Sequence, residues 1–150
     1  MGIVGVKIIT IDPKRVDQRG AVYEQFELNG IGYPHYTLYY RSLDARSSYH
    51  FHKGDNKSKD PEILLVLSGG LELIARNMFG ELLTEVVTNH GLNSNGVGIP
   101  AIIIDKNVCH QTISRSPDLI IMELWMEKFD PNFKDIYPKS EFDKLYKITI

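Results

Sequence analysis

The chain has 150 residues, of which 43% are hydrophobic and 24% are charged, and its formal net charge at pH 7 is -2. A chain of this size and composition is typical of one globular domain with a hydrophobic core, and we predict a single domain over residues 1–150. Its 17 Lys and Arg residues are scattered among 19 Asp and Glu residues, which argues against a surface that binds a row of nucleic-acid phosphates.

The predicted elements are short strands, rich in β-branched and aromatic residues, that alternate with turn signals such as Asn-Gly and Gly-Gly. Residues 12–20, DPKRVDQRG, are predicted as a connection, and only the tail at 139–147 has a helical pattern. This series predicts an all-β sandwich or barrel. In chain order, the predicted strands cover residues 5–11, 21–28, 35–43, 48–52, 62–69, 71–77, 82–89, 97–105, 108–114 and 119–127.

Several of the predicted strands are apolar on both faces, notably EILLVL at residues 62–67 and LIIMEL at residues 119–124. A strand of this kind is buried from both sides. Either other parts of the chain cover the outside of the barrel, or two subunits pack against each other there. We expect a homodimer.

Cysteine content and apolar runs bear on the location of the protein. Cys109 is the single cysteine, so no internal disulfide forms, as is usual in a reducing cytoplasm. No apolar run approaches the roughly 20 residues of a membrane span, and the N-terminal residues lack the apolar core of a signal peptide. We therefore expect a cytoplasmic protein without a membrane partner.

The segment SSYHFHKGDNKSKDPEILLVLSGG, residues 47–70, holds the main functional pattern. Residues i and i+2 of a strand project to one face, so His50 and His52 point together while the residue between them points away. Glu62 begins the next strand, and His110 follows a turn in DKNVCHQTIS. Three imidazoles and a carboxylate suit a divalent metal ion and leave coordination positions open, as in a catalytic site.

A simpler interpretation stands beside the metal site. Two histidines at a strand end also occur as solvent-exposed residues, and Glu62 can be a surface carboxylate. The apolar run after Glu62 favours the metal, because a carboxylate at the mouth of a buried strand needs a cation or a hydrogen-bond donor. The donor set accepts Zn, Mn, Fe, Ni and Cu, so it does not identify the ion.

These residues resemble the first motif of the cupins, which reads His-x-His, a gap, Glu, six residues and Gly. The motif is matched by His50, His52, Glu62 and Gly69, with a longer gap than usual before Glu62.

The second cupin motif ends in Pro-x-Gly-x-x-His and is similar to DKNVCH at residues 105–110. Asp105 stands in place of the proline, Asn107 in place of the glycine, and His110 is retained. Asn tolerates a left-handed turn better than most residues, so this departure is mild. Cys109 faces away from His110 by strand alternation, and we interpret it as a small buried residue.

Two longer segments narrow the resemblance to nucleotide-sugar cupins. Residues 17–27, DQRGAVYEQFE, are similar to the opening strand of the dTDP-sugar 3,5-epimerases and 3,4-ketoisomerases. Residues 124–138, LWMEKFDPNFKDIYP, look like the exit segment of WbuC-type cupin-fold metalloproteins and of the cupin domain of a capsule enzyme that epimerises a UDP-4-keto-6-deoxy sugar. The resemblance implies a small double-stranded β-helix (jelly-roll) barrel, usually dimeric, and a metal held by His50, His52, Glu62 and His110.

The function implied by the resemblance is an epimerase or isomerase that acts on a nucleotide-linked keto-deoxy sugar in surface-polysaccharide biosynthesis. Such a reaction removes a proton beside a carbonyl and therefore needs a general base and often a general acid. We predict His52 and Tyr39 as catalytic residues. Either Tyr39 or Tyr40 points inward, since neighbours in a strand face opposite ways, and most strand aromatics serve packing alone.

Three basic residues are predicted to bind the substrate. Arg41 and Lys53 lie near the predicted mouth of the barrel and suit a pyrophosphate. Arg19 resembles an arginine of the family's opening motif that helps to form the substrate pocket. Solvated surface charge is the simpler account of each.

Two other functions fit the same residues. A small metal-dependent dioxygenase uses three histidines and a glutamate to hold iron, and a non-enzymatic sugar-binding module needs the barrel without turnover. Oxygen uptake distinguishes the first from an isomerase, and ligand binding that survives His52→Ala distinguishes the second.

Overall fold

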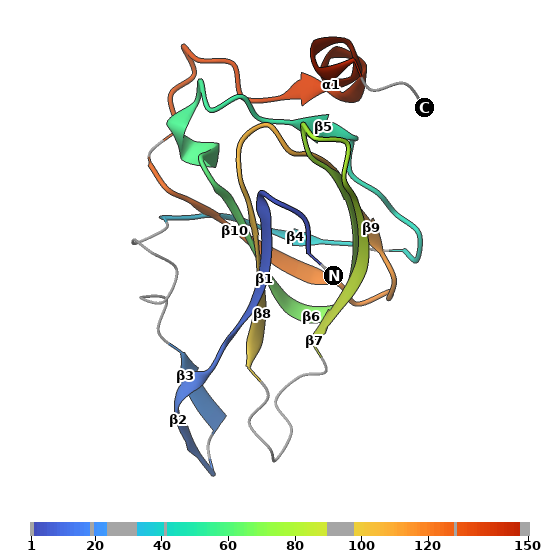
Figure 1. Cartoon of the computed structure of the whole chain (residues 1–150). Helices are drawn as coiled ribbons and strands as arrows, with labels where there is room; N and C mark the ends of the chain where they lie inside the picture. Colours follow the sequence, from blue (N-terminus) through green and yellow to red (C-terminus); the bar gives the residue numbers. More distant parts are fainter. Residues whose placement is uncertain are drawn as a thin grey trace.

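The computed structural model describes residues 2–18, 20–23, 33–40, 42–89, 98–127 and 129–147, with the backbone alone described for residues 16, 20–23 and 33–39. These parts form antiparallel strands and a short helix, as the sequence predicts (Figure 1). In chain order, the elements are β1 (Val6–Ile11), β2 (Pro13–Asp17), β3 (Gly20–Tyr23), β4 (Tyr33–Tyr39), β5 (His50–Phe51), the 3-10 turn η2 (Lys57–Lys59), β6 (Glu62–Arg76), β7 (Leu82–Asn89), β8 (Ile99–Ile104), β9 (Cys109–Ser114), β10 (Ile120–Trp125), β11 (Tyr137–Pro138) and α1 (Lys139–Tyr146).

Strand β6 organises the barrel, because it pairs with four other strands. Its first part pairs with β8 and β10, and its second part pairs with β7 and β9. The change occurs at Gly69, where φ is 79°. A Cβ atom there would lie 2.3 Å from the Ser116 Oγ. Only glycine fits this conformation and this close approach, so it lets one strand serve both sides of the barrel.

The sequence-based prediction missed the two-residue strand β11 and was wrong about two longer elements. It divided β6 at the Gly-Gly pair, whereas the structure has a continuous strand of 15 residues that bends there. It also treated residues 12–20 as a connection, whereas Pro13–Asp17 forms β2, which pairs with β3 in a two-stranded sheet. Proline is tolerated as the first residue of a strand, so its presence did not exclude one.

Both faces of the first part of β6, residues 62–66, are buried, as its composition predicts. Leu64 and Val66 belong to the core inside the barrel, which also contains residues of β8 and β10. Ile63 and Leu65 belong to a second core on the opposite face, and their exposed fractions are 1% and 3% in the single chain. The chain itself therefore covers these two residues, and the homodimer remains a prediction.

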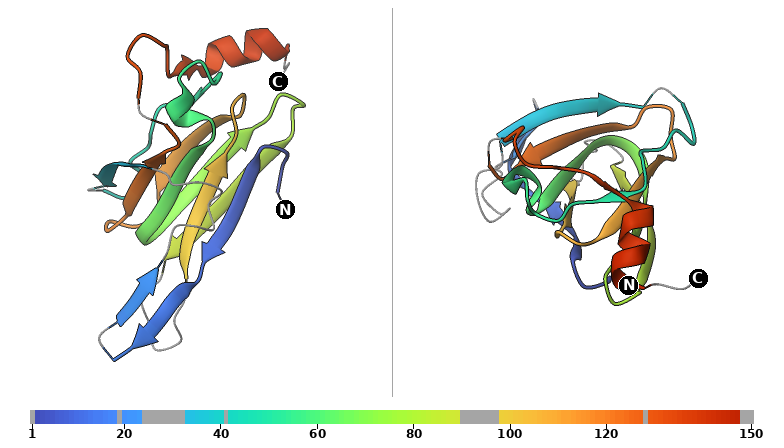
Figure 2. Two further views of the ribbon diagram at one scale, coloured as in Figure 1. Left: turned by 90° about the vertical axis from the view of Figure 1, so that its left-hand side faces the viewer. Right: turned by 90° about the horizontal axis from the view of Figure 1, so that it is seen from above.

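Helix α1 lies across one end of the barrel, and the β2–β3 ribbon projects from the other end (Figure 2). Phe142 of α1 is fully buried, and its ring centroid lies 5.2 Å from that of Phe51 on β5. Cys109 and Tyr137 complete this third core. The helix therefore anchors β5, the strand that carries His50 and leads directly into His52. Within the described residues, no helix combines the length and the apolar character that a bilayer span requires.

Candidate metal centre

His50 lies on β5 and His52 follows directly after that strand, and the centroids of their two rings are 5.1 Å apart. β5 lies between β9 and β11, with His50 opposite His110 on one side and opposite Pro138 on the other. Phe51 points to the opposite face, where it is fully buried. Cys109 is also fully buried in that apolar core. Strand alternation therefore orients these side chains as the sequence predicts.

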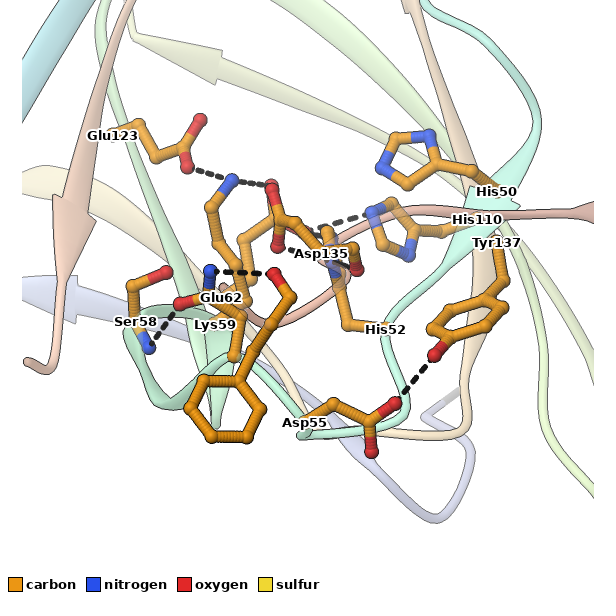
Figure 3. Close-up of polar contacts among 12 residues, drawn as sticks. His50, His52, Asp55, Ser58, Lys59, Glu62, His110, Glu123, Asp135 and Tyr137 are labelled. Atoms are coloured by element: carbon orange, nitrogen blue, oxygen red, sulfur yellow. Dashed lines mark hydrogen bonds and ion pairs between the residues drawn. The ribbon is translucent and has the colours of Figure 1, made fainter. Parts of the chain in front are cut away.

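The four predicted ligands meet at the α1 end of the barrel. One ligand atom from each of His50, His52, Glu62 and His110 lies within 4.8 Å of the others. Glu62 is the first residue of β6 and is 5% exposed, while His110 on β9 is 1% exposed. Figure 3 shows the three imidazoles gathered around this carboxylate. The structure thus brings together residues that are up to 60 positions apart in the sequence.

The three imidazoles are oriented in the same way, by backbone carbonyl groups. A carbonyl oxygen only accepts hydrogen bonds, so each Nδ1 atom carries a proton and donates it. The lone pair of a neutral ring is then on Nε2, which is the usual arrangement of a metal-ligating histidine. The Nδ1 contacts are His50 with the Ser48 carbonyl at 2.9 Å, His52 with the Asp135 carbonyl at 2.8 Å, and His110 with the Val108 carbonyl at 3.0 Å.

The Nε2 atoms of His52 and His110 each lie 2.9 Å from the same oxygen, Oε2 of Glu62. The His52 contact is a hydrogen bond. The His110 contact lacks hydrogen-bond geometry, and its buried Nε2 has no hydrogen-bond partner among the described residues. A lone pair this close to a carboxylate is repelled unless positive charge lies between them. The cluster therefore requires a cation, either a proton or a metal ion.

The pKa values show that the cluster favours positive charge on His52 and disfavours it on His50. Burial lowers the pKa of His50 to about 4, with a further lowering by nearby His110. Burial also lowers the pKa of His52, but hydrogen bonds to Asp135 and Glu62 outweigh it and raise the value to about 9. The pKa of Glu62 is well below its usual range, because the imidazoles outweigh the effect of burial. A carboxylate this acidic is ionised at neutral pH.

This donor set fits a divalent metal ion. It offers three imidazole nitrogens fixed in the correct tautomer, one ionised carboxylate, and a buried nitrogen that lacks a hydrogen bond. A metal ion meets the same need for positive charge as the proton on His52, so its binding would displace that proton. Several first-row divalent ions accept such ligands.

Three charged residues around the ligands were not predicted. Asp135 accepts from His52 Nδ1 through its carboxylate as well as its carbonyl, with the carboxylate oxygen 3.1 Å away. Lys59 and Glu123 form an ion pair beside Glu62, and both are buried (Figure 3). Glu123 could have been recognised from the sequence, because it is a carboxylate within an otherwise apolar strand, as Glu62 is.

A cavity of about 90 Å³ opens beside the cluster. Tyr40 lies on its wall, and the Tyr40 hydroxyl is 3.1 Å from the Thr112 Oγ1. Of the two neighbouring tyrosines, Tyr40 is therefore placed at the site. Tyr39 ends β4, and its side chain is outside the described part of the structure. The remaining lining residues are Ser47, His50, Lys59, Glu62, Leu64, His110, Ile121, Glu123 and Ile136.

A larger hollow of about 390 Å³ lies at the bend of β6, around Gly69 and Arg115. Its size does not make it the better candidate site. Arg115 is ion-paired with Glu72 and Asp44, and the hollow contains none of the clustered histidines. We therefore place the chemistry in the smaller cavity.

Of the predicted substrate-binding residues, the structure describes Lys53 alone. Its ammonium lies 2.6 Å from the Glu141 carboxylate and 4.0 Å from the centre of the Tyr137 ring. Lys53 thus ties the loop after β5 to α1. Arg19 and Arg41 lie outside the described residues.

The sequence matches no protein-family model and no curated protein. Solved structures are similar along almost the whole chain. A 3,4-ketoisomerase from Helicobacter canadensis is 17% identical, with a TM-score of 0.72 over 95% of this chain and 98% of that one. The sugar 3,4-ketoisomerase QdtA from Thermoanaerobacterium thermosaccharolyticum, in complex with TDP, is 14% identical, with a TM-score of 0.69 over 97% of each chain.

A third similar structure is a dTDP-4-dehydrorhamnose 3,5-epimerase from Bacillus anthracis with TDP and PPi bound. It is 14% identical, with a TM-score of 0.59 over 85% of this chain and 75% of that one. Likeness at these identities concerns the fold. The chain therefore has the cupin jelly-roll fold of the sugar ketoisomerases and epimerases, which confirms the fold that the sequence motifs predicted.

Proposed function

We propose that this protein is a metal-dependent isomerase or epimerase of a nucleotide-linked keto-deoxy sugar, acting in surface-polysaccharide biosynthesis. One observation supports it above the others. Three imidazoles, each with Nδ1 bonded to a carbonyl, present Nε2 to one buried carboxylate beside a cavity. The barrel around them has the fold of proteins described as sugar ketoisomerases and epimerases.

His50, His52, Glu62 and His110 would hold the metal ion. When bound, a divalent ion polarises a carbonyl and stabilises the negative charge that develops when the neighbouring proton leaves. The protein supplies the orientation: each histidine is fixed through Nδ1, and Asp135 adds a second acceptor for the proton of His52. Hydrogen bonds to the ring nitrogen that does not bind the metal fix the orientation of a histidine ligand and raise its basicity.

His52 has one Nε2 atom, and that atom cannot both ligate a metal and remove a proton from a substrate. His52 is 3% exposed and is hydrogen-bonded on one side to Glu62 and on the other to Asp135. This position suits a ligand better than a base that must reach a substrate. We therefore propose the ligand role for His52.

Tyr40 is the better candidate for proton transfer. Its hydroxyl group faces the cavity and contacts the Thr112 hydroxyl, so protons can pass along two adjoining hydroxyl groups. In an isomerisation, a proton leaves the carbon next to the carbonyl and another returns to a neighbouring atom. A hydroxyl pair on one wall of the cavity is suited to this exchange. We therefore propose Tyr40 in place of Tyr39 as the catalytic tyrosine.

The cavity volume of about 90 Å³ limits what enters. Ligand pockets that enclose a whole small molecule usually measure about 300–1,000 Å³. The reacting part of the sugar would thus occupy the cavity, and the nucleotide would lie outside it. Lys53, Arg19 and Arg41 are proposed contacts for the diphosphate, and Lys53 would then share its charge with Glu141.

The test is proton exchange in deuterated water. Metal-loaded protein is incubated with dTDP- and UDP-4-keto-6-deoxyglucose, and NMR follows the signals next to the carbonyl. We expect deuterium incorporation by the wild type and, because general acid–base groups contribute about 100- to 10,000-fold, a loss of that size in Tyr40→Phe. Tyr146→Phe, on α1, is the matched control. Absence of exchange with both sugars would count against the proposal.

A small iron-dependent dioxygenase is the second candidate, and the small cavity favours it, because a volume of about 90 Å³ suits a compact substrate. Iron-loaded protein would then consume oxygen in the presence of that substrate. Exchange of deuterium into the keto sugar without oxygen uptake would decide for the isomerase.

A further inference from the structure

Lys59 is a buried lysine on the wall of the cavity. It is 5% exposed, and its ammonium forms an ion pair with Glu123, which is 2% exposed. Lysine and glutamate are almost never this buried unless they are paired. Such a pair is weak evidence for stability, because well-packed apolar residues of similar volume are often as stable or more so. Its place on the cavity wall suggests a role at the site.

The position of Lys59 is fixed by the segment around it. Lys59 ends η2, which is capped by the Asn56 side chain on the Ser58 amide. The Ser58 carbonyl in turn accepts a hydrogen bond from the amide of Met126, just after β10. Glu123 lies on β10. The turn that carries the ammonium is therefore attached to the strand that carries its partner.

The contacts of Glu62 divide its two oxygens between two groups. Oε2 lies 2.9 Å from the Nε2 atoms of both His52 and His110. Oε1 lies 3.9 Å from the Lys59 ammonium. The carboxylate thus presents one oxygen to the imidazoles and turns the other toward a fixed positive charge (Figure 3).

We propose that Lys59 is a positioning residue for the metal centre, and that Glu123 holds Lys59 in place. The ammonium attracts Oε1, so that Oε2 alone faces the three imidazoles. Without Lys59, both oxygens are free to turn toward a bound ion, and a position otherwise available to substrate is lost. The inference rests on the proposed metal-dependent function, because it concerns the same ligands.

The test uses Co²⁺, whose visible absorption reports the number and arrangement of its ligands. The variant is the double substitution Lys59→Met with Glu123→Leu, which removes one charge of each sign and leaves the net charge unchanged. We expect weaker Co²⁺ absorption bands, typical of more ligands. We also expect affinity lower by about tenfold, the lower end for groups that orient a ligand. Lys57→Met is the control, because Lys57 lies on the same turn with its side chain 60% exposed.

A double variant that folds, with circular dichroism like the wild type, and keeps the wild-type Co²⁺ spectrum and affinity would overturn the inference. A second measurement needs no variant. A crystal structure of Co²⁺-loaded wild type should show Glu62 bound through one oxygen with the other on Lys59, and binding through both oxygens contradicts it.

The failures of the two proposals are distinguishable. If the wild-type protein takes up no Co²⁺, there is no metal centre, and both proposals are refuted. Normal Co²⁺ uptake with an unchanged spectrum in the double variant removes only the role of Lys59. If Co²⁺ uptake is normal but no keto sugar exchanges a proton, the proposed reaction is refuted and the role of Lys59 is unaffected.

Discussion

Asp135 is the residue whose contacts most directly stabilise the orientation of a ligand. Its carbonyl and its carboxylate both accept from His52 Nδ1, at 2.8 and 3.1 Å. Asp135→Ala removes only the carboxylate, so the ring keeps one acceptor. Loss of such a group typically weakens metal binding by about 10- to 100-fold, and we predict the lower end of this range.

A Co²⁺ titration measures the effect of Asp135→Ala. Asp130→Ala is the matched control, because Asp130 lies on the same segment and accepts hydrogen bonds from Asn132 rather than from a histidine. Equal losses in both variants would mean that the segment, and not the Asp135 carboxylate, maintains the site.

Cys109 is predicted to be chemically inert in the folded protein. Burial, together with the nearby Asp143 carboxylate, raises its pKa from 9.0 to about 12. The folded state therefore holds the thiol proton of Cys109 more tightly than the unfolded state does. The stability that this difference contributes is complete below about pH 9 and is lost as the pH rises toward 12. At about pH 8 the native thiol should not react with a thiol reagent, since the thiolate is the reactive form.

Reaction of Cys109 in increasing urea tests this prediction. The reacted fraction should follow the unfolding transition seen by circular dichroism. Rapid reaction in the absence of urea would show that the core around Cys109 opens readily or that the thiol is not buried.

At the scale of elements, α1 determines how firmly β5 is held. Phe142 is fully buried against Phe51 of β5, and Tyr137 of β11 is the strand partner of Phe51. Phe142→Ala should lower the free energy of unfolding by about 3–5 kcal/mol, the usual cost of a large cavity. Metal affinity should fall with it, because His50 and His52 follow the position of β5.

Urea unfolding and a Co²⁺ titration measure both effects of Phe142→Ala. Leu145→Ala is the control on the same helix, since Leu145 is 51% exposed and surface substitutions usually change stability by about 0.5 kcal/mol or less. Reduced stability with unchanged metal affinity would show that β5 keeps its place without the helix.

The two strand errors also have physical causes at this scale. Gly69 and Gly70 are typical of a turn in sequence, yet the backbone continues through them as one bent strand, because the neighbours leave no room for a side chain at Gly69. β2 is charged and begins with Pro13, and so lacks the apolar alternation by which a strand is recognised. It is recognisable only once its partner β3 is known.

For the whole molecule, the sequence predicted the barrel and the four residues of the histidine–glutamate cluster, but not the charged groups around them. That the cluster holds a metal ion remains a prediction. His50 and His52 were predictable because a strand has a period of two, and Glu62 because a carboxylate opened an apolar run. Lys59 ends the short turn η2 and Asp135 lies in the connection before β11, and both reach the site only through folding, so no local pattern identifies them. Tyr40 was distinguished from Tyr39 only by the cavity.

The central claim is that His50, His52, Glu62 and His110 hold a single divalent ion at the α1 end of the barrel. Elemental analysis of the purified wild type and of the His50→Ala, His52→Ala and His110→Ala variants tests it most directly. We predict a stoichiometric metal in the wild type and a sharp loss in each variant, with circular dichroism unchanged because the barrel core carries the fold. Full metal occupancy in all three variants, or a wild type that binds none of the metals offered, would contradict the claim.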